Sequence, residues 1–307
     1  MKIVLAILAG LVGLGAIAEV LLRVTQGLAD PPLYMADRDI GYLLVPNQKI
    51  RRHGNLLTTN QYSMRDREIT AKKTSDSQRI FLVGDSVVNG SWYTDQSQIL
   101  SALLAKKLAA NQSDNYEIFN ASTNSWGPRN ELAYLQRYGL FDSDTLILVI
   151  NTEDLFAIEP NSLAVGKTFA YRDRKPALAL IEFYQLYLAT PPTIPEIEQL
   201  RSLKTENLEA NLAAIQEIKA IATRNNTKFV LVLTPLLREF QEGSTVEETA
   251  ARIRLQKLVD AEGIDYLDFL EIWSDFPQPE FLYRDSIHPS PQGNNKIVEQ
   301  FISNIEP

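Results

Sequence analysis

The chain has 307 residues, of which 45% are hydrophobic and 22% charged, and its formal net charge is -8. This length and apolar content suit one medium α/β domain and argue against wholesale disorder. The acidic balance disfavours a nucleic-acid partner, which usually needs a basic face. The chain has no cysteine, which excludes disulfides, thiolate metal sites and a cysteine nucleophile.

The N-terminus is strongly apolar, because residues 3–22 contain a single ionisable side chain, Glu19. A helix of this length just crosses the hydrocarbon core of a bilayer. We therefore expect residues 1–25 to form a transmembrane anchor with the remainder on the extracytoplasmic side of the cell membrane. The alternative is a signal sequence cleaved near Ala18, since Ala16-Ile17-Ala18 resembles a cleavage site, and the protein would then be secreted or periplasmic.

A polar, irregular lead-in follows over residues 26–77, and we expect it to pack on the main domain. Short strands are predicted at 40–45 and 56–59. A basic group made of Lys49, Arg51, Arg52 and His53 has two interpretations. It contacts anionic lipid headgroups, or it forms a solvated turn, which is what charge runs usually do.

From residue 78 onward, apolar runs alternate with helical patterns. Strands are predicted at 79–83, 116–119, 145–150, 228–233 and 264–269. Helices are predicted at 97–110, 129–138, 206–224, 245–262 and 291–304. Two of the strands are almost continuously apolar, as parallel strands covered on both faces are. The pattern predicts an α/β fold, three layers deep, around a doubly wound and mostly parallel five-stranded sheet over residues 78–307.

An insertion at about 153–205 interrupts this rhythm. It contains a predicted helix at 177–188, which is too short for a second membrane span. An insertion at the carboxyl end of a strand often covers the active site as a lid. We interpret the aromatic stripe of this helix, Phe183, Tyr184 and Tyr187, as core or lid packing.

The first candidate catalytic residue is Ser86, in the segment Gly84-Asp85-Ser86-Val87-Val88-Asn89-Gly90. A strand runs directly into this segment, so the serine is expected where the next helix begins, at the carboxyl edge of the sheet. Free N–H groups there favour a developing oxyanion. The alternative is a structural helix cap, with Asp85 in a turn.

The second element is Asp285-Ser286-Ile287-His288 near the C-terminus. A serine nucleophile needs a base, and the base needs an acceptor that fixes its tautomer. Asp285 and His288 can meet on one tight turn, with His288 reaching Ser86. The chain has two histidines, and the other one, His53, has no acid placed comparably.

These motifs resemble the SGNH/GDSL hydrolases. GDSVVNG is similar to their block I, and DSIH is similar to their Asp-x-x-His block V. The resemblance covers residues 79–307 and implies a flavodoxin-like sheet and the hydrolysis of esters, thioesters or acetyl groups on sugars. The lead-in segments GYLLVPN and NQYSMR resemble those that precede this domain in bacterial membrane-anchored members.

The resemblance also implies an oxyanion hole, to which the Ser86 N–H contributes. Ser125 occupies the position of the family's Gly donor, and Gly127 lies two residues further on. The block III Asn position holds Glu153, and an ionised carboxylate cannot donate a hydrogen bond. Either Asn151 takes over the donation, or Glu153 is protonated, or the site is slower, since one donor is worth about 10²–10³ in rate.

The sequence therefore predicts a membrane-anchored serine esterase that works through a Ser86–His288–Asp285 triad and an acyl-enzyme. A small acyl ester or an O-acetylated polysaccharide is the expected substrate, and acetyl transfer is a variant. The alternative is a weak or inactive SGNH-like protein that binds glycan or assists polysaccharide assembly, with Glu153 as its main support. The sequence contains no HExxH and no phosphate-loop motif, and we expect neither a metal nor a cofactor.

Overall fold

The computed structural model describes residues 1–73, 77–110 and 115–305. Its centre is a five-stranded, entirely parallel sheet in the order β6-β5-β7-β8-β9. The strands are β5 (Ser77–Gly84), β6 (Asn115–Ser122), β7 (Thr145–Asn151), β8 (Lys228–Thr234) and β9 (Asp265–Asp268). This confirms the predicted fold class. The strand order reverses between β5 and β7, and ligands of doubly wound sheets bind at the carboxyl ends of the strands at such a point.

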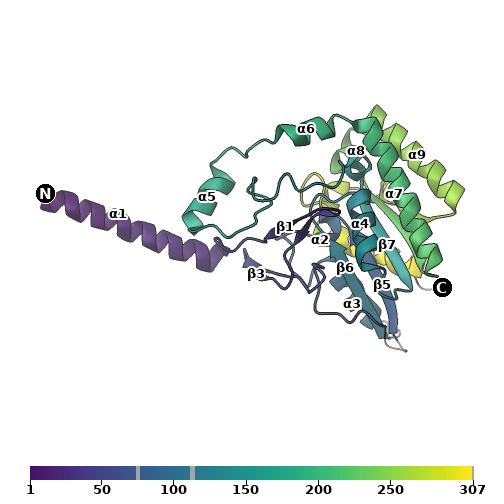
Figure 1. Cartoon of the computed structure of the whole chain (residues 1–307), viewed down its shortest axis with the longest axis horizontal. Coiled ribbons are helices and arrows are strands. Elements are labelled where there is room, and N and C mark those ends of the chain that lie inside the picture. Colours follow the sequence, from purple (N-terminus) through teal and green to yellow (C-terminus); the bar gives the residue numbers. More distant parts are fainter. Residues whose placement is uncertain (74–76, 111–114, 306–307) are drawn as a thin grey trace.

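Helices cover both faces of the sheet (Figure 1). One layer comprises α4 (Pro128–Tyr138), α7 (Lys204–Arg224) and α9 (Val246–Glu262), and the other comprises α3 (Leu100–Ala110) and α11 (Pro291–Ile305). Side chains alternate along β5: Phe81 and Val83 pack under the first layer, whereas Ile80 and Leu82 pack under the second. A strand with two apolar faces needs both layers to remove it from water.

Short helical segments complete the domain, several of them at the strand ends. They are α2 (Ser86–Asn89), the 3₁₀ turn η2 (Thr152–Phe156), α6 (Pro195–Arg201), α8 (Leu237–Gln241), α10 (Phe269–Ile272) and the 3₁₀ turn η3 (Pro279–Leu282). Of these, α2 and η2 begin directly after β5 and β7. They therefore place their first residues at the carboxyl edge of the sheet.

The lead-in forms two antiparallel hairpins, β1 (Tyr34–Asp37) with β2 (Gly41–Leu44) and β3 (Lys49–Arg52) with β4 (Asn55–Thr58). Ile40, Leu43 and Met64 are buried in the core beneath the α4 layer. Arg65 is fully buried, and its guanidinium donates to the carbonyl oxygens of Asn89, Ser91 and Thr94. The lead-in thus holds the loop that follows α2.

The basic group of the lead-in is only partly a solvated turn, because exposed and buried side chains alternate along it. Lys49 and Arg51 are exposed. Arg52 is only 2% exposed and forms an ion pair with Glu182, at 3.0 Å. His53 stacks on Trp92, with the ring centroids 4.9 Å apart. The solvated-turn interpretation is therefore wrong for Arg52, whose partner lies 130 positions further along the chain.

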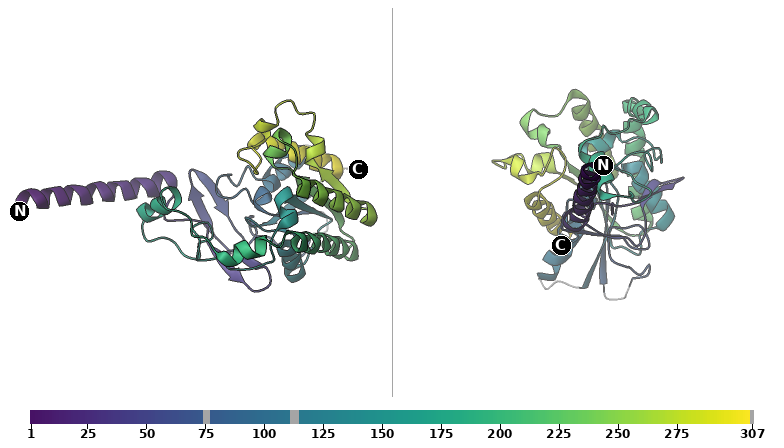
Figure 2. Two further views of the ribbon diagram at one scale, coloured as in Figure 1. Left: turned by 90° about the horizontal axis from the view of Figure 1, so that it is seen from above. Right: turned by 90° about the vertical axis from the view of Figure 1, so that its left-hand side faces the viewer.

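The N-terminal helix α1 (Lys2–Leu21) continues through a π-helical turn, η1 (Leu22–Gln26), and projects away from the domain (Figures 1 and 2). Over Lys2–Gln26 it is long and apolar enough to cross a membrane, with a mean hydropathy of 2.4, and no residue of α1 is buried. Length and composition therefore agree with a membrane anchor or a signal sequence.

The insertion contains helix α5 (Ala179–Tyr187), one or two residues shorter at each end than expected. The sequence predicts that the aromatic stripe of this helix packs in the core or as a lid, and this prediction is wrong. Tyr184 and Tyr187 are 57% and 55% exposed, and Phe183 is 37% exposed. The buried side of the helix is instead formed by Ala179 and Glu182. The physical reason is the ion pair of Glu182 with Arg52, which turns the polar side of the helix inward.

Candidate active site

Ser86 is the first residue of α2, at the carboxyl end of β5. Asp85 caps this helix by accepting a hydrogen bond from the Val87 N–H at 2.8 Å. Gly84 is required for the tight passage from strand to helix, because a Cβ there would lie 2.5 Å from the Val149 carbonyl oxygen. As the first helical residue, Ser86 has an N–H with no acceptor inside the helix.

His288 connects Ser86 to Asp285. Its Nε2 lies 2.9 Å from Ser86 Oγ, and its Nδ1 lies 2.9 Å from both carboxylate oxygens of Asp285. The turn that carries both residues is closed by the Arg284 N–H, which donates to the His288 carbonyl oxygen at 2.8 Å. The structure therefore brings these three side chains within hydrogen-bond distance of one another, although 202 positions separate Ser86 from His288.

The Asp285 carboxylate is held in its ionised form. Partial burial opposes ionisation, but hydrogen bonds from the N–H groups of His288 and Ile287, at 2.8 and 3.0 Å, together with the imidazole, outweigh it and lower the pKa to about 2. At neutral pH this carboxylate accepts from the His288 Nδ1–H. The tautomer that leaves Nε2 free to accept a proton from Ser86 is thereby favoured.

Tyr93 borders the histidine and was not expected from the sequence. Its ring lies 6.2 Å from that of His288, and the Arg284 guanidinium stacks on it at 4.2 Å. Tyr93 is 43% exposed and lines a neighbouring cavity of about 420 Å³, not the cleft over Ser86. No sequence signal singles it out, because it lies in an irregular loop whose position is set by Arg65.

Ser125 and Gly127, the two backbone oxyanion donors considered after β6, differ in exposure and in hydrogen bonding. Ser125 is exposed in the cleft and adopts the left-handed conformation (φ 58°) that Gly occupies readily, and its Oγ accepts from the Tyr171 hydroxyl at 2.8 Å. Gly127 is buried, and its N–H donates to Asn130 Oδ1 at 3.1 Å. A Cβ at Gly127 would lie 2.2 Å from that of Ala157. Its missing side chain therefore serves packing, and its N–H is engaged outside the oxyanion position.

Asn151 is also engaged. Its amide nitrogen donates to Asp85 Oδ2 at 2.8 Å and to Asp154 Oδ2 at 2.9 Å, while its Oδ1 accepts from the Glu153 N–H at 2.7 Å. Both amide hydrogens are thus directed at carboxyl groups. This geometry makes Asn151 a support for Asp85 and not an oxyanion donor. Glu153 is exposed and lines the same cleft as Ser86 and His288.

Three carboxyl groups lie buried beneath the nucleophile. Burial raises the pKa of Asp85, and burial together with the neighbouring acids raises the pKa values of Asp154 and Glu131 well above their usual range. Neither carboxyl oxygen of Glu131 has a hydrogen-bond partner within the described chain. Ser86 Oγ lies 3.1 Å from Asp85 Oδ2, so the hydroxyl has a second acceptor besides His288.

The cleft over Ser86 has a volume of about 450 Å³. Much of its wall comes from the insertion, which supplies Ile158, Glu159, Asn161, Ala164, Tyr171, Ile197 and Arg201. Within residues 1–73, 77–110 and 115–305, no group of three His, Asp or Glu side chains is arranged to hold a metal ion. The residues that line the cleft include Ser86, His288 and the exposed carboxylates of Glu153 and Glu159.

A model of the GDSL-like lipase/acylhydrolase family matches residues 82–296, which include Ser86, Asp285 and His288. No curated protein matches the chain. Among solved structures, TesA is 19% identical with a TM-score of 0.49, over 75% of this chain and 99% of its own. A lipase/acylhydrolase from Enterococcus faecalis is 16% identical (TM-score 0.45, 74% and 95% covered). A catalytic mutant of the acetylxylan esterase Axe2 from Geobacillus stearothermophilus is 12% identical (TM-score 0.48, 78% and 97% covered).

Proposed function

The chain belongs to the GDSL-like lipase/acylhydrolase family, and we propose that it is a serine esterase with Ser86 as its nucleophile. The observation that carries the proposal is the position of His288, whose two ring nitrogens each lie 2.9 Å from a partner, Ser86 Oγ on one side and Asp285 on the other. Serine chemistry near neutral pH needs this contact between nucleophile and base.

The reaction begins when Ser86 Oγ attacks the acyl carbon and passes its proton to His288 Nε2. Asp285, ionised and fixed by backbone N–H groups, stabilises the imidazolium. The N–H groups of Ser86 and Ser125 receive the oxyanion, since the amides of Gly127 and Asn151 are engaged elsewhere. The imidazolium then protonates the leaving alcohol, and water activated by His288 releases the acid from the acyl-enzyme.

We place this activity outside the cytoplasmic membrane, with α1 as a single-pass anchor. The exposed apolar surface of α1 supports this location, and an O-acetylated cell-wall or exported polysaccharide is the substrate class that fits it. Digestion of the domain by protease added to intact spheroplasts is the expected result, and full protection would contradict export. If mass spectrometry finds that the mature protein begins at Glu19, α1 is a cleaved signal sequence and not an anchor.

A second candidate function is glycan binding without efficient hydrolysis, as in polysaccharide assembly. The specific observation in its favour is Glu153, an exposed carboxylate in the cleft at the position where the family resemblance implies an amide donor. A carboxylate repels a developing oxyanion. A protein whose Ser86 is not activated would still have a cleft of the right size to hold an acetylated sugar.

Labelling with a fluorophosphonate probe separates these two functions, because the probe reacts only with an activated serine. We expect the full-length wild type to be labelled and Ser86→Ala to be unlabelled. Ser125→Ala is the matched control, since it removes another serine hydroxyl from the same cleft and leaves the triad intact. Absence of labelling in the wild type would reject the hydrolase and leave the glycan-binding function.

A further inference from the structure

Helix α5 exposes its apolar side chains and buries its charged one, the reverse of a helix packed on a soluble domain. Glu182 is 1% exposed and Ala179 is fully buried. On the outer side lie large apolar or aromatic residues that are 37–69% exposed: Leu178, Ile181, Phe183, Tyr184, Tyr187 and Leu188. Large apolar side chains exposed in this number on and beside one short helix mark a site of interaction.

The orientation of α5 is fixed by buried polar contacts. The Glu182 carboxylate accepts from the Ala29 N–H and pairs with Arg52, and Gln185 Oε1 accepts from Arg172 at 2.7 Å. Rotation of the helix to bury its aromatic side would leave Glu182 and Arg52 as unpaired charges, which is costly. The apolar side is therefore held outward by the rest of the protein.

The same helix is attached to the end of α1. Glu19, the ionisable residue of the apolar segment, accepts hydrogen bonds from the N–H groups of Ala179 and Leu180 at 2.8 and 3.0 Å, the first two residues of α5. Arg23 donates to the Ala177 carbonyl oxygen at 3.1 Å. In Figure 1 and in the left view of Figure 2, α5 lies beside the domain end of α1. A span of 20 residues reaches the edge of the hydrocarbon core at this end.

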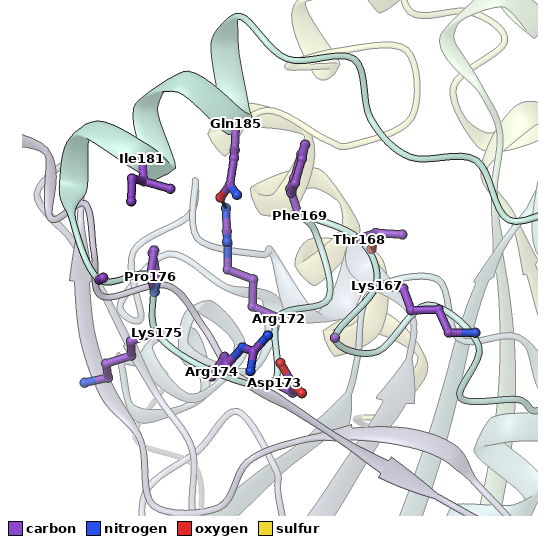
Figure 3. Close-up of a pocket in the computed structure, with 12 residues that line it drawn as sticks. Lys167, Thr168, Phe169, Arg172, Asp173, Arg174, Lys175, Pro176, Ile181 and Gln185 are labelled. Atoms are coloured by element: carbon purple, nitrogen blue, oxygen red, sulfur yellow. Dashed lines mark hydrogen bonds between the residues drawn. The ribbon is translucent and has the colours of Figure 1, made fainter.

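A basic cavity of about 420 Å³ adjoins α5 (Figure 3). Its lining includes four cationic side chains, Lys167, Arg172, Arg174 and Lys175, and one acidic side chain, Asp173. Lys175 pairs with Asp30 at 2.6 Å and Arg172 with Glu182 at 4.0 Å, so the positive charge available to an outside anion rests mainly on Lys167 and Arg174. The exposed Arg51 lies near the same end, because its backbone packs against Gly27, directly after the anchor. Cationic groups beside an apolar surface are what an anionic bilayer surface attracts.

We propose that α5 is an interfacial helix, seated in the same bilayer that α1 crosses, with its apolar side below the headgroups and the basic cavity at headgroup level. This rests on the membrane anchoring given under Proposed function. Two attachments hold the domain more firmly than one. They also fix the orientation of the cleft over Ser86 relative to the membrane. A single span followed by a flexible linker would instead let the domain rotate.

The absence of cysteine allows a direct test with single labelled positions in the full-length chain. Tyr184→Cys reports on α5, Leu11→Cys on the middle of α1, and Ile253→Cys on α9 at the far end of the molecule. The three native side chains are 57%, 61% and 52% exposed, so they are matched in accessibility. Each variant carries an environment-sensitive fluorophore and is reconstituted in phosphatidylcholine vesicles containing phosphatidylglycerol, with quenchers placed on the lipid at headgroup or acyl-end depth.

We expect the Tyr184 label to be quenched most from the headgroup region, the Leu11 label most from the acyl ends, and the Ile253 label by neither. Leaving out phosphatidylglycerol should weaken the Tyr184 signal and leave the Leu11 signal unchanged. If Leu11 is quenched while Tyr184 behaves like Ile253, the interfacial helix is refuted and the anchor stands. If neither Leu11 nor Tyr184 is quenched, both proposals fail. If the Tyr184 signal does not change when phosphatidylglycerol is left out, the proposed contact of the basic cavity with anionic headgroups is refuted.

Discussion

Replacement of Glu153 by Asn is the perturbation that most directly tests how this cleft handles an oxyanion. Glu153 lies in η2, directly after β7, and its backbone is fixed by the hydrogen bond from its N–H to Asn151 Oδ1 at 2.7 Å. Its side chain is exposed in the cleft that contains Ser86 and His288. An Asn there presents an amide donor from the same backbone position, where the carboxylate presents a negative charge.

The two consequences of this replacement differ in size. Removing an exposed charge is worth about 1 kcal/mol at short range in water, or roughly fivefold in rate. Adding one well-placed oxyanion donor is worth about 2.7–4 kcal/mol, or 10²–10³ in rate. Glu153→Gln isolates the first effect, since it removes the charge but carries its amide one methylene further out. We therefore expect a rise of about fivefold for Glu153→Gln and about 10²-fold for Glu153→Asn.

The assay is kcat/KM for a small uncharged acetyl ester, measured for all variants at one pH and ionic strength. Glu159→Asn is the matched control, because Glu159 is another exposed carboxylate lining the same cleft. An equal rise in Glu159→Asn would mean that general electrostatics of the cleft is responsible. A Glu153→Asn rate no higher than the wild type would refute the reasoning and leave Glu153 with a role in binding or as a protonated donor.

Three further changes test other parts of the site. Ser125→Gly should leave kcat/KM nearly unchanged and alter the free energy of unfolding by no more than about 1 kcal/mol, because the N–H donor remains and relief of the left-handed conformation offsets the entropy of Gly; a large loss of activity would instead assign the role to its hydroxyl. Asp285→Asn should lower kcat by about 10³–10⁴ without unfolding the protein, since the imidazole loses its tautomer control, and retention of activity in a steady-state assay would reject the triad. Glu131→Gln should flatten the pH dependence of stability: the raised pKa of buried Glu131 contributes stability below its ordinary value of 4.5 that is lost as pH rises through the folded-state pKa. Denaturant unfolding at pH 5 and pH 8 measures this, and parallel curves for wild type and variant would exclude Glu131 as the source.

The sheet and the Ser86–His288–Asp285 arrangement could be predicted from the sequence, because each follows from short stretches of neighbouring residues. A buried parallel strand is apolar along most of its length, as residues 146–150 are. Parallel strands place their following loops at one edge of the sheet, so a serine after β5 is brought to that edge by topology alone. Asp285 and His288 lie on one turn and need no other element in order to meet.

The buried charges could not be predicted in the same way. Arg52 and Glu182 are ordinary surface residues by type, and their burial depends on a partner that only the tertiary fold supplies. Arg65 is buried because three carbonyl oxygens converge on it from one loop. The orientation of α5 follows from such a pair, which is why a stripe that has the spacing of a core face lies on the outside. The sequence also does not show that the Asn151 amide is engaged by Asp85, because Asp85 lies 66 positions away and the fold alone brings the two together.

The charges around Ser86 indicate which residue most affects the choice between the two proposed functions, ester hydrolysis and glycan binding. Asp85, Asp154 and Glu131 are buried, and burial raises the pKa of each, so that ionisation of these carboxyl groups is opposed. Among the exposed groups that line the described cleft, Glu159 is accompanied by the cations Arg201 and Lys204. Glu153 stands instead at the position where the family resemblance implies an amide donor. We therefore expect the exposed carboxylate of Glu153, and not the buried acids, to limit the rate of the proposed hydrolysis.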